Sequence, residues 1–463
     1  MPHIAIFPTP GMGHLIPLIE LARKLLELHT NLTITFIIPD DGLPTKPQKS
    51  LLQSFPAINS VFLPPPSDEL DLPDSKIETR IVLSVIRSIP SLIEALHELN
   101  KSTRLSAFIA DLFGSHTFGA VKGLGIPFYL FFTSSAMVLS FSFYLSELDE
   151  SCDCEYRDLP EPVKVPGCVP VLGSDLPDPV QDRKSQAYRG SIEMCKQFES
   201  PDGILINTFL DLELDAFKSF DLGNHPPVYP VGPLVRTGST IKSDNECLKW
   251  LDKQPEGSVL FVSFGSGGTL SRQQLTELTA GLEMSRQRFL LVAKRPNDEI
   301  KNAAYFTGVG DEIKIDEHFE YLSADFLERT KEKGYVISQW APQVEVLRHV
   351  AVGGFLSHCG WNSTLESIVN GVPLIAWPLF AEQRMNAVLL SEGMKVAMRV
   401  RENENGVVER DEISELARRL MEGDEGEEMR KRMSGFKDAA MKALSCDGSS
   451  IRALASVAEK WIG

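Results

Sequence analysis

The feature that most constrains this chain is a pair of apolar runs separated by a glycine-containing turn and a helical segment. Residues 350–357 are rich in valine and phenylalanine, which predicts a buried strand. A turn at 358–360 follows, and the helical segment after it ends at Asn370-Gly371, a dipeptide typical of a helix C-terminus. The second apolar run is 372–377. The pattern is a β-α-β unit, and it predicts an α/β fold with a parallel sheet.

Polar side chains at the start of this helical segment predict an anion site. Asn362 or Ser363 is suited to cap the helix, and Glu366 stands three residues after Ser363, as in a capping box. The N–H groups of a helix N-terminus bind phosphate groups, and His358 would add a further donor. A purely structural interpretation stays open, in which Glu366 only caps its own helix and Trp361 is a core residue.

Two further groups of residues are expected at the same edge of the sheet. Trp340 follows a short predicted strand at 335–338, and its flat indole suits stacking on a base. Glu382 and Gln383 follow the second apolar run, where a carboxylate and an amide can bind sugar hydroxyls. The combination is consistent with a site for a nucleotide that carries a sugar.

The N-terminal segment predicts a second β-α-β unit. A strand at 3–8 leads through a turn that contains Gly11 and Gly13 to a helix at 15–29, and a β-rich run follows at 32–39. Two glycines allow a tight turn close to a ligand. The missing third glycine, and the lack of a clear ribose-binding acid later on, count against a dinucleotide site.

His14 and Asp111 are candidate catalytic residues at the rim of this unit. His14 comes just past the first strand, and Asp111 ends a predicted strand at 105–110. Open α/β sheets bind ligands at the carboxyl ends of their strands. An acid behind a histidine fixes its tautomer and stabilises the imidazolium, which makes the histidine a competent base. The structural alternative is that both residues only cap a turn or a helix.

Length, charge and cysteine content narrow the class of protein. A chain of 463 residues predicts two domains, and a net charge of −17 argues against nucleic acid or an anionic membrane as a partner. Seven scattered cysteines favour a reducing compartment, and no signal peptide is visible, so we expect a cytoplasmic protein. The uncharged segment 126–145 is long enough to span a bilayer, but its serines and Pro127 favour a buried strand and helix, so no stable membrane insertion is expected.

The domain boundary is expected in the proline- and glycine-containing segment 229–240. This gives domains at 1–235 and 241–463, with the option that the last helix packs back on the first domain. A second glycine-rich turn at 265–268 follows a clean strand and is also suited to touch a diphosphate. The polar, acidic stretch 296–324 is predicted to be a mobile surface loop.

Residues 340–383 resemble the signature box of the plant family 1 UDP-sugar glycosyltransferases. The stretch opens with W-A-P-Q, has H-C-G-W-N-S at its centre and closes with E-Q. A match of this length is far more specific than a short glycine motif. The resemblance covers nearly the whole chain, from Pro8 to the last helix, and within the family it is greatest to the hydroquinone and monolignol glucosyltransferases.

The resemblance implies a GT-B-type α/β fold, in which two facing Rossmann-like domains with parallel sheets bind the two substrates. It implies an inverting transfer of glucose from UDP-glucose to a hydroxyl of a small phenolic or other hydrophobic plant metabolite, with no metal. UDP-glucose is a co-substrate, and no cofactor is expected. The family's catalytic histidine falls on His14, in P-G-M-G-H, and its partner aspartate on Asp111. The closing glutamine is assigned to users of UDP-glucose. The positions assigned to the donor are Ser266, Trp340, Gln343, His358, Trp361, Asn362, Ser363, Glu366, Glu382 and Gln383.

Two other functions share parts of this pattern. A Rossmann-type dehydrogenase would have the same β-α-β opening, and a sugar-nucleotide-binding protein without activity would keep Trp340 and Glu366 but would not need His14 with Asp111. A monomer is expected. The sequence does not name the acceptor, and it leaves O-, N- and S-glycosylation open.

Overall fold

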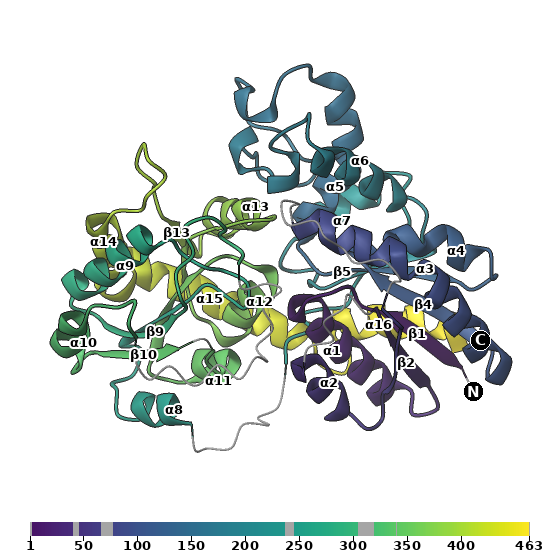
Figure 1. The fold of residues 1–463 in the computed structure, drawn as a ribbon, viewed down its shortest axis with the longest axis horizontal. Coiled ribbons are helices and arrows are strands. Elements are labelled where there is room, and N and C mark those ends of the chain that lie inside the picture. Colours follow the sequence, from purple (N-terminus) through teal and green to yellow (C-terminus); the bar gives the residue numbers. More distant parts are fainter. Residues whose placement is uncertain are drawn as a thin grey trace. The chain divides into compact units, whose positions relative to one another are not determined.

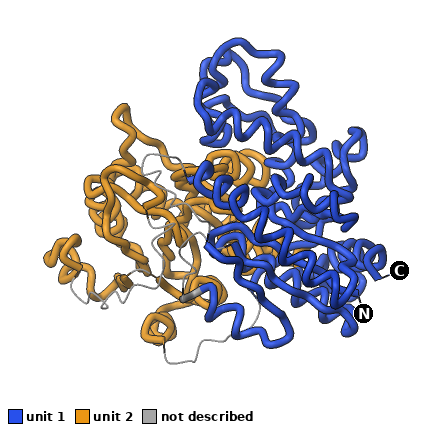
Figure 2. Tube along the Cα trace, turned by 45° about the vertical axis from the view of Figure 1, so that its right-hand side comes forward, with its two compact units in different colours: residues 1–236, 441–463 blue, residues 237–440 orange. Residues whose placement is uncertain are grey.

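The computed structural model describes residues 2–39, 46–65, 77–236, 245–303, 319–338 and 340–462. The chain divides into two compact units, which Figure 2 shows in separate colours. Unit 1 consists of Met1–Arg236 with Met441–Gly463, and unit 2 consists of Thr237–Ala440. The last residues of the segment expected to form the second domain, 441–463, therefore lie in unit 1.

Unit 1 is built on a parallel sheet of seven strands in the order β3-β2-β1-β4-β5-β6-β7. Its central strands are apolar and buried on both faces, as expected where helices cover both sides of a parallel sheet. The strands are β1 His3–Phe7, β2 Thr33–Ile38, β3 Asn59–Phe62, β4 Leu105–Asp111, β5 Phe128–Phe132, β6 Gly203–Ile206 and β7 Val228–Pro230.

The helices of unit 1 connect these strands, apart from α16, which follows unit 2 in the chain (Figure 1). They are α1 Met12–Leu28, α2 Lys46–Gln53, α3 Ile77–Ser102, α4 Phe118–Lys122, α5 Ala136–Ser151, α6 Gln186–Gln197, α7 Leu214–Phe220 and α16 Ser449–Ile462, with short 3-10 turns η1 Leu112–Thr117, η2 Tyr156–Asp158, η3 Gly173–Asp175 and η4 Asp178–Val180.

The C-terminal helix α16 is part of the unit 1 core. Leu454, Val457 and Trp461 are buried in one hydrophobic cluster with residues of α1 and of the sheet. The Trp461 ring packs edge-on against Tyr129 of β5, with the ring centroids 5.1 Å apart. Residues from opposite ends of the sequence therefore stabilise the same sheet.

Unit 2 has a parallel sheet of six strands in the order β10-β9-β8-β11-β12-β13. Helices α9 and α14 share a hydrophobic cluster with this sheet. The strands are β8 Val259–Ser263, β9 Arg288–Ala293, β10 Gly334–Ser338, β11 Val352–Ser357, β12 Leu374–Ala376 and β13 Ala397–Arg399. The helices are α8 Glu246–Leu251, α9 Arg272–Ser285, α10 Ala324–Thr330, α11 Gln343–Arg348, α12 Trp361–Asn370, α13 Gln383–Val388, a π-helical turn at Leu389–Gly393, α14 Arg410–Glu422 and α15 Asp424–Ala443, which crosses the boundary between the units.

Each sheet has one point at which the strand order reverses. In unit 1 it lies between β1 and β4, and in unit 2 it lies between β8 and β11. Parallel sheets of this kind open a crevice at the carboxyl ends of the strands where the order reverses, and ligands bind there. The fold therefore marks one candidate binding edge in each unit.

Three predictions about connecting segments meet different outcomes. The segment 126–145 forms β5 and α5, as predicted, and no helix of the described part of the chain is long and apolar enough to cross a membrane. The boundary between the units falls between Arg236 and Thr237, inside the expected segment 229–240, although Tyr229 and Pro230 at its start belong to β7, the last strand of the unit 1 sheet. Within the expected loop 296–324, residues 304–318 lie outside the described residues. Before that gap the chain hydrogen-bonds to the turn at Thr269 and Leu270, so that part is not a loose loop.

Candidate active site

His14 and Asp111 lie side by side at the carboxyl edge of the unit 1 sheet. His14 is in the first turn of α1, after β1, and Asp111 ends the neighbouring strand β4. The His14 Nδ1 and Asp111 Oδ2 atoms are 3.2 Å apart, although their alignment is not that of a hydrogen bond. The His14 side chain is 14% exposed and that of Asp111 is fully buried. Part of the imidazole is thus accessible to a substrate, whereas the carboxylate is not exposed to solvent.

Hydrogen bonds to both oxygens hold Asp111 in place. Its Oδ2 accepts from the Thr9 backbone N–H at 2.8 Å and from the Thr9 hydroxyl at 2.6 Å. Its Oδ1 accepts from the N–H groups of Phe113 at 3.1 Å and Gly114 at 3.3 Å, as the N-cap of η1. Asp111 is therefore both a structural cap and a carboxylate fixed beside a histidine. Thr9 gave no signal in the sequence, since a threonine in a turn usually faces solvent.

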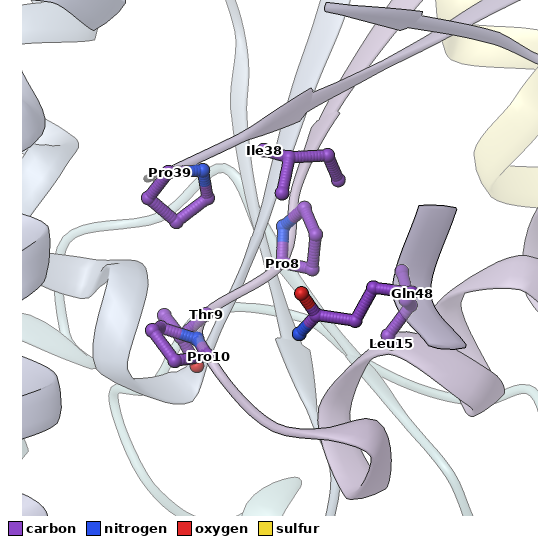
Figure 3. Close-up of a pocket in the computed structure, with 7 residues that line it drawn as sticks. All are labelled: Pro8, Thr9, Pro10, Leu15, Ile38, Pro39 and Gln48. Atoms are coloured by element: carbon purple, nitrogen blue, oxygen red, sulfur yellow. The ribbon is translucent and has the colours of Figure 1, made fainter. Parts of the chain in front are cut away.

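A small pocket opens beside this pair in unit 1 (Figure 3). It lies where β1 and β2 end, and Gln48 of α2 extends toward Pro8 across it. Thr9, the partner of Asp111, and Leu15, the neighbour of His14, both line it. The full lining is Pro8, Thr9, Pro10, Leu15, Ile38, Pro39 and Gln48. The wall is mostly apolar, with a hydroxyl and an amide.

In unit 2 the candidate anion site lies at the start of α12, after β11. The helix begins at Trp361 with Gly360 as its N-cap, and no side chain caps it. The predicted capping box is therefore wrong, because the helix starts before Ser363 and Glu366 is bound to another partner. The predicted end at Gly371 is confirmed, with a positive φ of 77°. An N-terminus without a side-chain cap is suited to receive a phosphate.

His358 is packed between two glycine turns at this edge. A Cβ on Gly265 would lie 2.5 Å from the His358 Nε2 atom, and one on Gly360 would lie at the same distance. His358 is 9% exposed, and its Nδ1 makes no hydrogen bond within the described residues. Burial, and then the charge of Lys294, lower the pKa of His358 to about 3. The imidazole is therefore neutral at physiological pH.

Gln343, Ser363 and Glu366 form a ready-made polar cluster. The Gln343 amide donates to the Ser363 hydroxyl at 2.8 Å and to Glu366 Oε2 at 2.6 Å, which joins α11 to α12. Trp340 precedes α11 and is 52% exposed, one of the most exposed large apolar side chains described. An exposed indole beside an amide and a carboxylate suits a base and a ribose.

Glu382 and Gln383 lie on the segment after β12, at the start of α13. Gln383 is buried, and its Oε1 accepts from the N–H groups of Leu379 at 2.9 Å and Phe380 at 3.1 Å. The acceptor half of this amide is therefore occupied by the protein. Its Nε2 takes no part in these bonds, so a donor function stays available.

Asn386 connects the two ends of the predicted site, and sequence reasoning missed it. This fully buried side chain donates to the carbonyl of Cys359 at 3.1 Å and to Glu382 Oε1 at 3.3 Å. Cys359 and Ala381 adopt positive φ values of 63° and 57°, which non-glycine residues rarely do. Strained backbone of this kind clusters at functional sites. The only sign of this connection in the sequence is an asparagine in the middle of a helix.

The predicted donor residues thus gather at one edge of unit 2, with one exception. Trp361 is 2% exposed, so its indole belongs to the core and only its backbone faces the turn. Ser266 is exposed on the turn after β8, directly after Gly265, against which the His358 ring packs. Asn362 is half-buried in the first turn of α12. Within the described residues, no group of three or more His, Cys, Asp or Glu side chains is arranged to hold a metal ion.

Comparison with known proteins places these residues in a family context. A family model described as UDP-glucoronosyl and UDP-glucosyl transferase matches residues 241–411. The chain is 53% identical to hydroquinone glucosyltransferase of Rauvolfia serpentina, over 99% of this chain and 98% of that protein. The structure of Phytolacca americana UGT2 with UDP-2fluoro-glucose and pterostilbene matches with a TM-score of 0.91, 47% identity and full coverage of both chains. A UDP-glucosyltransferase from Polygonum tinctorium, capable of glucosylating indoxyl and solved with 3,4-dichloroaniline, matches with a TM-score of 0.91, 45% identity and coverage of 100% and 99%.

Proposed function

The chain belongs to the plant family 1 UDP-glycosyltransferases, and on that premise we propose that it transfers glucose from UDP-glucose to a hydroxyl of a small phenolic or other hydrophobic acceptor. The names of its relatives support a phenolic acceptor, since one is a hydroquinone glucosyltransferase and another was solved with pterostilbene. The observation that carries the proposal is the His14–Asp111 pair at the reversal point of the unit 1 sheet.

In the proposed reaction His14 is the general base. Its Nε2 takes the proton of the acceptor hydroxyl as the oxygen attacks the anomeric carbon. The negative charge of Asp111, whose Oδ2 lies 3.2 Å from Nδ1, favours the tautomer with its proton on Nδ1 and stabilises the imidazolium that forms. The bond from the anomeric carbon to the phosphate oxygen breaks on the opposite face, so the centre inverts and UDP leaves. The balance of atoms and charge needs no metal and no further cofactor.

The groups proposed for the leaving UDP lie in unit 2. The first turn of α12 and the turn at Ser266 offer N–H groups to the diphosphate, and His358 donates one more hydrogen bond. Because the pKa of His358 is lowered to about 3, it acts as a neutral donor and not as a cation. Asn362 and Ser363 belong to the same turn.

Recognition of the nucleoside and of the sugar is assigned to two separate groups. Trp340 stacks on the uracil, and Gln343 with Glu366 binds the uracil edge and the ribose hydroxyls. Glu382 accepts and Gln383 donates hydrogen bonds to the glucose hydroxyls. We include in the proposal a monomeric, cytoplasmic enzyme that prefers UDP-glucose to other UDP-sugars. Family membership removes the support for a dehydrogenase.

The test is turnover of a panel of phenols and alcohols with UDP-glucose, UDP-galactose and UDP-glucuronate, read by product mass. We expect glucosides of phenols and a preference for UDP-glucose. His14→Ala should abolish transfer to weakly acidic alcohols, keep a little activity with phenols that ionise easily, and bind UDP as before. Normal turnover by this variant would refute the assigned base. Binding of UDP without turnover of any acceptor by the wild type would leave only a sugar-nucleotide-binding protein.

A further inference from the structure

Lys294 occupies the binding edge of unit 2 without having been assigned a function. It directly follows β9, the strand next to β8, and is half-buried. Its Nζ donates to the backbone carbonyls of Gly265, at 2.5 Å, and of Ser266, at 2.6 Å. These carbonyls belong to the turn that follows β8, at the point where the strand order reverses. The lysine is therefore held to the turn proposed for the diphosphate.

The charge of Lys294 has no protein counter-ion among the described residues. Burial lowers the pKa of its ammonium to about 8, and no charge of a described carboxylate contributes to that pKa. Removing a cation from water without a partner costs free energy, and the cost is recovered when an anion arrives.

Lys294 and His358 belong to one cluster around Gly265. The His358 ring fits against Gly265 so closely that a Cβ there would lie 2.5 Å from Cε1 and Nε2. Lys294 binds the carbonyl of the same glycine, and its charge contributes to the lowered pKa of His358. The His358 Nδ1 is buried without a described partner. Two donor groups, one of them cationic, thus lie at a glycine turn, and no carboxylate of the described residues is paired with either of them.

We propose that Lys294 donates to a phosphate oxygen of the nucleoside diphosphate and neutralises the charge that grows on departing UDP. An ammonium has three donors, and the two carbonyls of the turn take two of them, which leaves one for the ligand. The carbonyls fix Nζ in position, while Nζ shields the anion from their partial negative charge. The inference rests on the proposed function and adds to it a cation that assists a leaving group without a metal.

The test compares ligands that differ only in their phosphates. Dissociation constants of UDP, UMP and uridine are measured by calorimetry for the wild type, Lys294→Met and Lys294→Arg. We expect Lys294→Met to weaken UDP binding by about 10- to 100-fold, the range for one hydrogen bond to a charged group, and to leave uridine binding unchanged. Lys294→Arg should retain most of the UDP affinity. Lys301→Met removes an exposed cation of the same segment and should change nothing.

The outcomes separate this inference from the proposed function. A ratio of UDP to uridine affinity equal to that of the wild type in Lys294→Met would overturn it. If that variant fails to fold, Lys294→Gln, which retains a donor amide but no charge, is subject to the same comparison. Failure of the wild type to bind UDP would instead defeat the proposed function. In steady-state assays, kcat should fall more than the KM for UDP-glucose rises, because charge on the phosphate grows as the bond breaks.

Discussion

Replacing Asp111 by asparagine separates its structural function from its proposed catalytic one. The side chain keeps its shape, but one of its two oxygens becomes an NH₂ group. If the remaining oxygen stays with Phe113 and Gly114, the NH₂ group replaces Oδ2 opposite the backbone N–H and the hydroxyl of Thr9, at 2.8 and 2.6 Å. The hydroxyl can rotate and accept a hydrogen bond, whereas the backbone N–H cannot.

The expected loss of stability follows from this count of hydrogen bonds. One buried N–H group without an acceptor costs about 1–3 kcal/mol, and the opposite orientation of the amide would leave two such groups. The NH₂ group also faces His14 Nδ1, which moves the imidazole proton to Nε2, where the base must accept. We therefore expect kcat with an alcohol acceptor to fall by about 10²–10⁴-fold, the contribution of a general base, with little change in acceptor KM.

The assay pairs urea unfolding with steady-state kinetics on an alcohol and on an acidic phenol. Thr9→Val is the matched control, because it removes the 2.6 Å hydrogen bond but keeps the carboxylate beside His14. It should lose stability while retaining most of kcat. An Asp111→Asn enzyme with unaltered kcat would reduce Asp111 to the cap of η1. Unaltered stability would contradict the hydrogen-bond argument.

Three further predictions concern unit 2. Gly265→Ala places a Cβ 2.5 Å from the His358 ring at a φ of +69°, so we expect the free energy of unfolding to fall by at least about 1–2 kcal/mol. UDP should also bind more weakly in calorimetry, and a wild-type affinity would count against this packing. Gln383→Glu retains an acceptor for the N–H groups of Leu379 and Phe380 but loses the amide donor. The kcat/KM for UDP-glucose should therefore decrease by an amount equivalent to about 1–3 kcal/mol of transition-state binding, while the affinity for UDP is preserved. An equal loss of UDP affinity would contradict the assignment of this donor to the sugar. Because burial holds the pKa of His358 at about 3 against its usual 6.5, the unfolded chain binds a proton that the native chain excludes. The unfolding free energy is therefore highest well above pH 6.5 and decreases by about 2 kcal/mol between pH 7.5 and pH 5. Urea titrations at each pH measure this dependence, and His358→Gln should remove it.

The buried strands, and the polar residues at the sheet edge where these strands end, could be predicted from the sequence. The buried strand expected within 126–145 is β5 at Phe128–Phe132, where five consecutive apolar residues are all buried. His14 and Asp111 were expected to meet because each follows a strand, and parallel strands end at one edge. By contrast, β3 at Asn59–Phe62 gave no signal, since it lies at the edge of the sheet and is mostly exposed.

The remaining details depend on contacts between segments distant in sequence. The capping box failed because the Gln343 amide, from another helix, binds both Ser363 and Glu366. The hydrogen bonds from the N–H groups of Leu379 and Phe380 to Gln383 depend on the positive φ of Ala381, and an alanine in the sequence does not predict a positive φ. A lysine directly after an apolar strand, such as Lys294, usually indicates only that the end of the strand is exposed to solvent. Local patterns thus predicted which residues lie together at the candidate site, and tertiary contacts decided which of their donors and acceptors are already bound by the protein.

The membership of α16 in the unit 1 core has a consequence for biosynthesis. Strands β1 to β7 leave the ribosome early. The apolar surface around Tyr129 stays uncovered until Leu454, Val457 and Trp461 of α16 have been synthesised, after unit 2. Unit 2 is a continuous segment and has all its residues before then. The usual N-to-C order of domain completion is therefore reversed: the first unit to emerge is the last to close its core. A chimera that exchanges unit 1 between relatives must accordingly be cut in two places and carry 441–463 with it.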